Sequence, residues 1–149
     1  MLIGISPLLT PELLMILQAM GHGDEIAIVD ANYPAASNAK RLVRLDGVDA
    51  SQALIAVLSV FPLDSFVKAP ANCMAVVGKP KEIPPAVADF QTIVDRLSAF
   101  PTKIARIERF GFYERAKTCF AHVATSDRRL YANIILTKGV IGSDGKVVA

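Results

Sequence analysis

The apolar positions of the chain switch repeatedly between helical and extended spacing. Thr10-Pro11-Glu12 has the N-cap, first-turn proline and acidic first turn of a helix, and the apolar face that follows predicts a helix over residues 11–20. Gly21 stands at the expected C′ position, and the apolar run 25–29 predicts a strand buried on both faces. Asp30 therefore falls at the carboxyl end of a buried strand, where open α/β sheets place their ligand crevices.

The same alternation continues through the rest of the sequence. Asp49 and Gln52 form a capping-box pattern before an apolar helix over residues 53–61, and Pro84-Pro85 opens a helix with three-four-three apolar spacing. A further helix is predicted over 112–118. Strands are predicted at 42–45, 73–77, 103–109, 120–125 and 130–136, the last two as a candidate hairpin.

This order of elements predicts one three-layer α/β domain over residues 1–149. Its core is expected to be a central, largely parallel or mixed sheet flanked by helices. The segment after about residue 140 is rich in Gly and Val. We expect it to be loosely held or to cover a neighbouring subunit.

Composition narrows the class of protein. Apolar residues make up 52% of the chain and the mean hydropathy is +0.41, yet no apolar run reaches the roughly 18 residues that cross a bilayer. We expect no membrane span, and a homo-oligomer whose contacts cover the apolar excess. With a net charge of +2, the chain lacks the concentrated positive field of a nucleic-acid-binding protein, so nucleic acid is not an expected partner.

Two features indicate the compartment. The N-terminus lacks the basic and apolar regions of a signal peptide. Cys73 and Cys119 are isolated cysteines in apolar surroundings, without CxxC spacing, and are interpreted as buried free thiols. A cytoplasmic location is therefore expected.

His22 is the leading candidate for acid–base chemistry. Glycines flank it on both sides and give its loop backbone freedom, and imidazole is the side chain best suited to proton transfer near neutrality. With Asp30 it forms a candidate acid–base pair, although spacing alone favours an ordinary surface histidine. His22, Asp24 and Asp30 lack the paired His or Cys spacing of a metal site, so no metal is expected.

Two further groups of residues suit sugar recognition. Charged and aromatic residues interleave over 108–115, and aromatic faces beside polar groups bind the C–H face and hydroxyls of sugars. The alternative is a helix whose aromatic face joins the core. Tyr131 and Asn133 lie two apart, so on a strand they would share a face; the alternative there is ordinary solvent-facing polarity. His122, in an apolar strand, is interpreted as structural.

Several blocks of the sequence together resemble the L-fucose mutarotase family, the sister of the D-ribose pyranases. They follow one another in order over nearly the whole chain, at 11–14, 20–26, 30–35, 61–64, 106–116 and 131–140. The resemblance implies an α/β fold, no metal or organic cofactor, and a ring-like homo-oligomer with sites near subunit contacts. Bacterial members are typically decamers, so a decamer is expected.

The resemblance also implies roles for individual residues. Carried over by position, His22 is the proton donor, and Asp30, Arg109, Tyr131 and Asn133 bind the sugar. The implied reaction interconverts the anomers of L-fucose or a similar aldose through ring opening. Alternatives are a pyranose–furanose interconversion of D-ribose, a non-catalytic monosaccharide-binding module linked to transport, and a structural oligomer with a vestigial site. Ala132 departs from the glycine of bacterial members, and its methyl is a candidate determinant of sugar preference.

Overall fold

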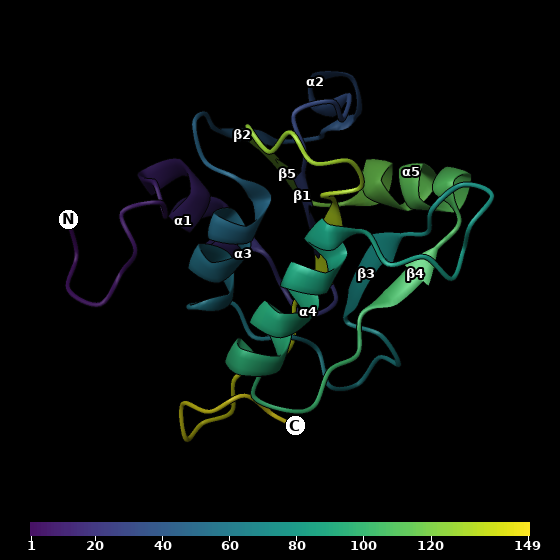
Figure 1. Ribbon diagram of the computed structural model, residues 1–149. Coiled ribbons are helices and arrows are strands. Elements are labelled where there is room, and N and C mark those ends of the chain that lie inside the picture. Colours follow the sequence, from purple (N-terminus) through teal and green to yellow (C-terminus); the bar gives the residue numbers. More distant parts are fainter.

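A computed structural model describes residues 1–149, and its centre is one six-stranded sheet in the order β2-β5-β1-β6-β3-β4 (Figure 1). β6 is antiparallel to its neighbours β1 and β3, and the other pairs are parallel. The predicted α/β fold with a mixed sheet is therefore confirmed. The strands are β1 Glu25–Val29, β2 Leu42–Leu45, β3 Ala71–Met74, β4 Ala105–Ile107, β5 Ala121–Thr125 and β6 Ile134–Thr137.

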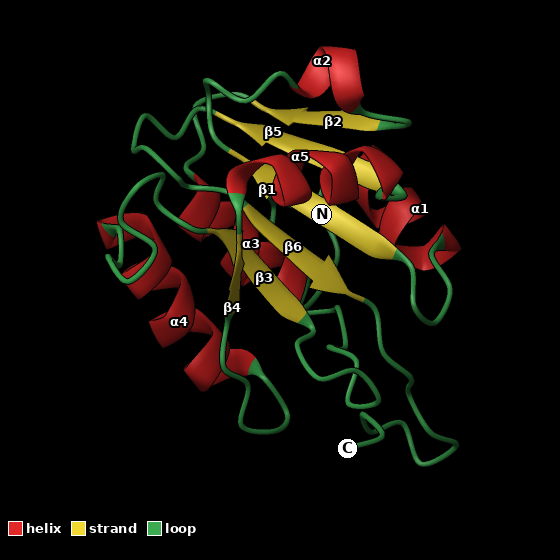
Figure 2. Ribbon diagram, turned by 90° about the vertical axis from the view of Figure 1, so that its right-hand side faces the viewer, coloured by secondary structure: helices red, strands yellow, loops and turns green.

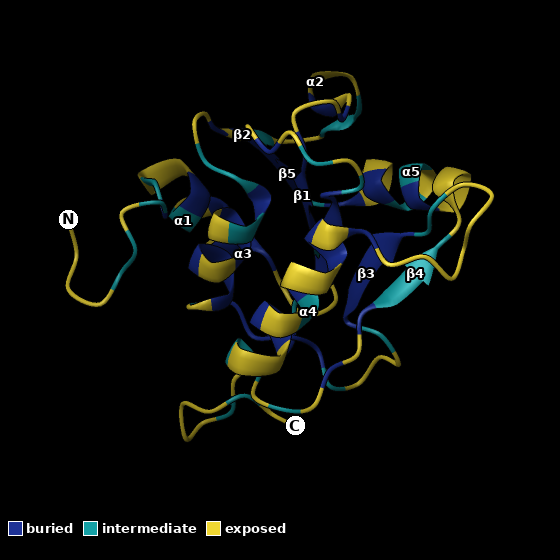
Figure 3. Cartoon of the chain, viewed as in Figure 1, coloured by how far each residue is buried: buried dark blue, intermediate teal, exposed yellow.

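Helices cover both faces of this sheet (Figure 2). One face packs against α1 Pro11–Ala19, α3 Ala50–Leu58 and α4 Pro85–Leu97, and the other against α2 Ala35–Asn38 and α5 Arg109–Thr118. Successive residues of β1 point to opposite faces, so Ile26 and Ile28 join the larger cluster while Ala27 and Val29 join the smaller. The inner strands β5, β1, β6 and β3 are almost entirely buried, the edge strands β2 and β4 are only partly buried, and the helices expose their outer sides (Figure 3).

Local sequence signals explain the helix starts. The Thr10 hydroxyl accepts a hydrogen bond from the Leu13 N–H, and Pro11 opens α1. Asp49 and Gln52 form the predicted capping box, which starts the helix at Ala50, three residues before the predicted start. α1 ends at Ala19 with Met20 as its C-cap, so Gly21 occupies the predicted C′ position. The chain leaves the helix in extended conformation, and the positive φ of the following turn, 85°, belongs to Gly23.

The predicted hairpin between the last two strands is wrong. β5 pairs with β1 and β2, whereas β6 pairs with β1 and β3, so β1 lies between them. The segment 126–133 is a loop held by hydrogen bonds to α3, α4 and the segment after β3, and the buried strand begins only at Ile134. Tyr131 and Asn133 therefore sit in that loop and not on a strand.

The C-terminal segment folds back on itself. Ile141 and Val147 form an isolated antiparallel bridge, and the Ser65 hydroxyl donates to the carbonyl oxygen of Val148 at 2.6 Å. The segment is thus tied to the loop that precedes β3. No helix of the chain combines the length and apolarity that a membrane crossing requires.

Candidate functional site

Asp30 and Asn133 meet at one edge of the sheet. Asp30 follows β1 and Asn133 precedes the antiparallel β6, so the two residues lie side by side. The Oδ1 of Asn133 accepts the Asp30 N–H at 2.8 Å, and its Nδ2 donates to Oδ2 of Asp30 at 2.9 Å. Both residues are buried. Burial raises the pKa of the Asp30 carboxyl, although hydrogen bonds from Asn32 and Asn133 oppose the shift, and a raised pKa makes the carboxylate a better proton acceptor.

A cleft of about 240 Å³ opens beside this pair. Four of the five predicted site residues line it, which brings Asp30, Arg109, Tyr131 and Asn133 together. Arg109 begins α5, and the Glu108 side chain caps that helix by accepting the N–H groups of Phe110 and Gly111. The cleft is completed by Asn32, Tyr33, Met74, Tyr113 and Leu130.

Tyr131 adopts an unusual backbone conformation. Its φ of 63° makes it the one non-glycine residue with positive φ, a conformation that costs a bulky residue on the order of 1–2 kcal/mol. Its hydroxyl accepts the Val77 N–H at 3.2 Å, which joins the β5–β6 loop to the segment after β3. Such strain persists only where surrounding contacts enforce it.

Aromatic rings stack behind the cleft. Tyr33 stacks on Tyr113 with centroids 5.3 Å apart and planes 13° apart, and its other neighbour is His122 at 5.6 Å. His122 is fully buried in β5, and neither of its ring nitrogens has a hydrogen-bond partner, nor does the Tyr33 hydroxyl. Burial raises the pKa of Tyr33 and lowers that of His122. Tyr33 and Tyr113 thus present an apolar surface next to the polar group around Asp30.

His22 lies elsewhere. Its Nε2 is 3.2 Å from Oδ1 of Asp64, and the Phe66 ring packs against the imidazole with centroids 5.5 Å apart. The Asp64 carboxyl is almost completely buried and also accepts the Phe66 N–H at 3.0 Å. About half of the His22 side chain is exposed. The pair presents an imidazole to solvent with its Nε2 held by a fixed carboxyl.

The backbone around Asp64 explains how this carboxyl is fixed. The Asp64 N–H donates to the carbonyl oxygen of Thr137, and the Gly139 N–H donates to the carbonyl oxygen of Pro62. A Cβ on Gly139 would approach the Leu63 carbonyl oxygen to 2.3 Å, so only glycine allows the two segments to come this close. The end of β6 therefore places Asp64 beside the His22 loop.

The predicted pairing of His22 with Asp30 does not form within one chain. His22 precedes β1 and Asp30 follows it, and a five-residue strand separates its two ends by about 13 Å. His22 and Asp30 therefore lie at opposite ends of the strands of the sheet. Closeness in sequence was misleading here, because the intervening residues are fully extended.

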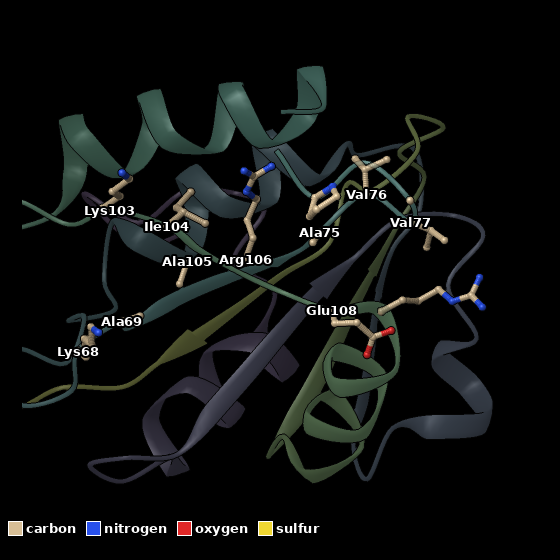
Figure 4. A pocket seen from close by; sticks show the side chains of 13 residues that line it. Lys68, Ala69, Ala75, Val76, Val77, Lys103, Ile104, Ala105, Arg106 and Glu108 are labelled. Carbon is tan, nitrogen blue, oxygen red and sulfur yellow. The ribbon is translucent and has the colours of Figure 1, made fainter. Parts of the chain in front are cut away.

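A larger groove of about 940 Å³ runs beside the edge strand β4 (Figure 4). Lys68, Lys103 and Arg106 provide positive charge along it, and Arg109 and Val77 also line it. Arg109 thus borders both this groove and the smaller cleft. No group of three or more His, Cys, Asp or Glu side chains is arranged to hold a metal ion.

Sequence reasoning missed Asp64, Tyr33 and Tyr113 as parts of these sites. Asp64 is 42 positions from His22, so no local spacing connects them. The block 61–64 contributed to the family resemblance without indicating a role for its aspartate. Tyr33 lies between β1 and α2 and Tyr113 in the aromatic segment 108–115, and only the tertiary fold stacks them.

Comparisons with known proteins agree with this architecture. Residues 3–141 match the model of the RbsD / FucU transport protein family. The chain is 45% identical to fucose mutarotase of Homo sapiens, with 93% of each chain covered. It is 39% identical to L-fucose mutarotase of Actinobacillus pleuropneumoniae, with 94% of this chain and 97% of that one covered.

Solved structures show the same fold. The fucose mutarotase of Streptococcus pneumoniae in complex with L-fucose is 42% identical, with a TM-score of 0.88 over 95% of this chain and 100% of that one. RbsD of Bacillus subtilis complexed with D-ribose is 20% identical, with a TM-score of 0.73 over 90% and 95% of the two chains. At that identity the second likeness concerns the fold alone.

Proposed function

Because the chain belongs to the RbsD / FucU transport protein family, we propose that it is a mutarotase that interconverts the α and β anomers of L-fucose. The names of the relatives and the L-fucose bound to one of them support the substrate. The observation that carries the proposal is the cleft around Asp30. A buried carboxyl with a raised pKa lies there beside Arg109, Tyr131 and Asn133, which suit a ligand rich in hydroxyl groups.

Mutarotation requires the movement of two protons. The anomeric hydroxyl loses its proton, the bond between the anomeric carbon and the ring oxygen breaks to give the aldehyde, and the ring oxygen takes a proton. Rotation of the aldehyde and reclosure give the other anomer. In the proposed mechanism Asp30 binds a hydroxyl and accepts the anomeric proton, while protonated His22 donates to the ring oxygen.

The remaining residues orient the sugar. Arg109, Tyr131 and Asn133 hold hydroxyl groups by directed hydrogen bonds, which keeps the reacting oxygens beside the acid and the base. General acid–base help of about 10²–10⁴-fold suffices for a reaction that already proceeds unaided. The chemistry calls for an acid, a base and a binding site, and therefore for no cofactor.

The separation of His22 and Asp30 within one chain suggests how copies of the chain assemble. Since the two lie at opposite ends of β1, we propose that His22 of one copy completes the cleft around Asp30 of another in a homo-oligomer, with a decamer as the expected form. Exposed apolar side chains support contacts at both places: Phe66 beside His22 and Leu130 in the cleft are each about two-thirds exposed. Two buried free thiols support a cytoplasmic location.

Saturation-transfer NMR tests the reaction directly. Wild type, His22→Ala and Asp30→Asn are measured on L-fucose, D-ribose and other aldoses, and exchange between anomers and between ring forms is followed. We expect accelerated anomer exchange of L-fucose that is lost in both variants. Faster pyranose–furanose exchange of D-ribose would favour a ribose pyranase, and binding without acceleration would favour a sugar-binding module.

Mixed oligomers test the shared site. His22→Ala and Asp30→Asn chains carrying different tags are co-expressed, and assemblies containing both are purified. If each site takes His22 and Asp30 from different copies, about a quarter of the sites regain both residues in a random closed ring. No recovery would count against a site shared between copies. Light scattering on the same samples gives the number of subunits.

A further inference from the structure

An ion pair within the β5–β6 loop connects the cleft to the opposite face of the sheet. Asp127 is 3% exposed. The Oδ2 of Asp127 accepts two hydrogen bonds, one from the Ala50 N–H at the start of α3 and one from Nη2 of Arg129 at 2.7 Å. The Oδ1 of Asp127 accepts the backbone N–H of Arg129 at 2.9 Å. Its carbonyl oxygen accepts the Ala31 N–H at 2.9 Å. Asp127 thus holds both the loop and the residue next to Asp30.

Arg129 extends this network to two helices. Its Nη1 donates to Asp89 in α4 at 2.6 Å, and its Nη2 donates to the Ser51 hydroxyl in α3 at 2.9 Å. Burial alone would raise the pKa of Asp127, but the hydrogen bonds from Arg129 and the Ala50 N–H outweigh it and hold that pKa below its usual range. The pair therefore stays ionised at neutral pH.

The loop between this network and β6 carries three residues of the cleft, Leu130, Tyr131 and Asn133. Tyr131 follows Arg129 by two positions and holds its φ of 63°. Asn133 fixes the other end of the loop through its two hydrogen bonds to Asp30. A tyrosine leaves the left-handed region unless both sides of the turn are held. Arg129 and Asp127 provide the anchor on the upstream side.

We propose that Asp127 and Arg129 are positioning residues that hold Tyr131 in its left-handed conformation and thereby aim its side chain at the sugar. The inference rests on the proposed function of the cleft. Neither residue lines the cleft, so each acts through the loop. The expected effect is a misplaced Tyr131, and a misplacement of about 1 Å can cost up to about a hundredfold in rate.

The first test combines kinetics with an amide signal. Arg129→Ala is expected to raise the KM for L-fucose about tenfold while the protein stays folded by circular dichroism. The Val77 amide resonance, which reports the hydrogen bond to the Tyr131 hydroxyl, should move to its position in Tyr131→Phe. Arg44→Ala removes an ion pair to Asp46 that is largely exposed on both sides and should change neither quantity.

A double-mutant cycle separates positioning from general stability. Glycine adopts positive φ freely, so in a Tyr131→Gly background Arg129→Ala should add no further loss in kcat/KM. Additive losses would overturn the proposal, as would a Val77 amide that stays in its wild-type position in Arg129→Ala. The amide signal needs no sugar and no turnover. It therefore decides the inference even if wild type leaves every sugar unchanged, an outcome that would count only against the proposed function.

Discussion

His22 and Asp64 form a fixed pair in which Nε2 of the imidazole lies 3.2 Å from Oδ1 of the carboxyl. A carboxylate only accepts hydrogen bonds, so the nitrogen that faces Asp64 carries a proton and Nδ1 is left to face the substrate. The arrangement resembles the orienting carboxylate of a catalytic triad, because a buried acid sets the orientation of the imidazole ring.

Asp64→Asn should therefore slow the reaction without preventing sugar binding. The asparagine oxygen can still accept the Phe66 N–H, but a neutral amide oxygen forms a weaker hydrogen bond to Nε2 of His22 than a carboxylate does, so the imidazole is held less firmly. We expect anomer exchange to fall about tenfold or more, within the range of general acid catalysis, with little change in the Kd for L-fucose. Saturation-transfer NMR and calorimetry measure the two quantities.

Asp46→Asn is the matched control for this substitution. Asp46 also pairs with a basic residue, Arg44, but is exposed and neither lines the cleft nor contacts His22. Its exchange rate should equal that of wild type. Unchanged exchange in Asp64→Asn would remove Asp64 from the mechanism, and loss of folding in that variant would show that the buried carboxyl is required for stability.

The methyl group of Ala132 should affect stability and not sugar preference. Ala132 is fully buried in the larger apolar cluster and does not line the cleft, although it lies between two residues that do. Ala132→Gly should lower the free energy of unfolding by about 0.5–1 kcal/mol because glycine gains more freedom in the unfolded chain. The ratio of exchange rates on L-fucose and D-ribose should stay at its wild-type value; a changed ratio would place the methyl in contact with the sugar.

Local signals explain what the sequence predicted well. The N-cap of α1 and the capping box of α3 are hydrogen bonds between neighbours, so residues within three positions of each other determine them. The buried run of β1 and the position of Asp30 at its end followed from apolar pattern alone. These features made it possible to predict that the cleft lies at the carboxyl end of β1.

The errors arise where distant segments decide the structure. Leu130 and Tyr131 carry the large side chains of a strand, yet the loop they occupy is shaped by contacts with α3, α4 and the segment after β3. The partner of His22 is likewise set by the close approach of Gly139 to Leu63. Neither relationship has a spacing that a single sequence reveals.

Both thiols should be unreactive in the folded protein. Cys73 is fully buried and Cys119 is 1% exposed. Burial raises the pKa of both, that of Cys119 to about 12, so the nucleophilic thiolate is scarce at neutral pH. Ellman's reagent should label neither within minutes under native conditions and both in guanidinium chloride. Rapid labelling of the native protein would show that the apolar cluster around the labelled thiol, the larger one for Cys73 or the smaller one for Cys119, opens easily.

The buried imidazole of His122 should make stability depend on pH. Burial lowers its pKa in the folded protein, so below a pH of about 6.5 the unfolded chain binds a proton that the folded chain does not. The free energy of unfolding should therefore fall as the pH decreases from about 6.5 toward the folded pKa. Urea denaturation at about pH 7.5 and about pH 5.5, at constant ionic strength, measures this loss.

His122→Phe should remove this part of the pH dependence. Phenylalanine keeps an aromatic ring beside Tyr33 and removes two ring nitrogens that have no hydrogen-bond partner. Replacing an unsatisfied buried polar group by an apolar group of similar shape is nearly neutral or stabilising, so the variant should be at least as stable as wild type at neutral pH. An equal loss of stability on acidification in both proteins would contradict this account. The proton uptake would then belong to other groups, and the folded protein would have to accommodate a charged His122 at the centre of its sheet.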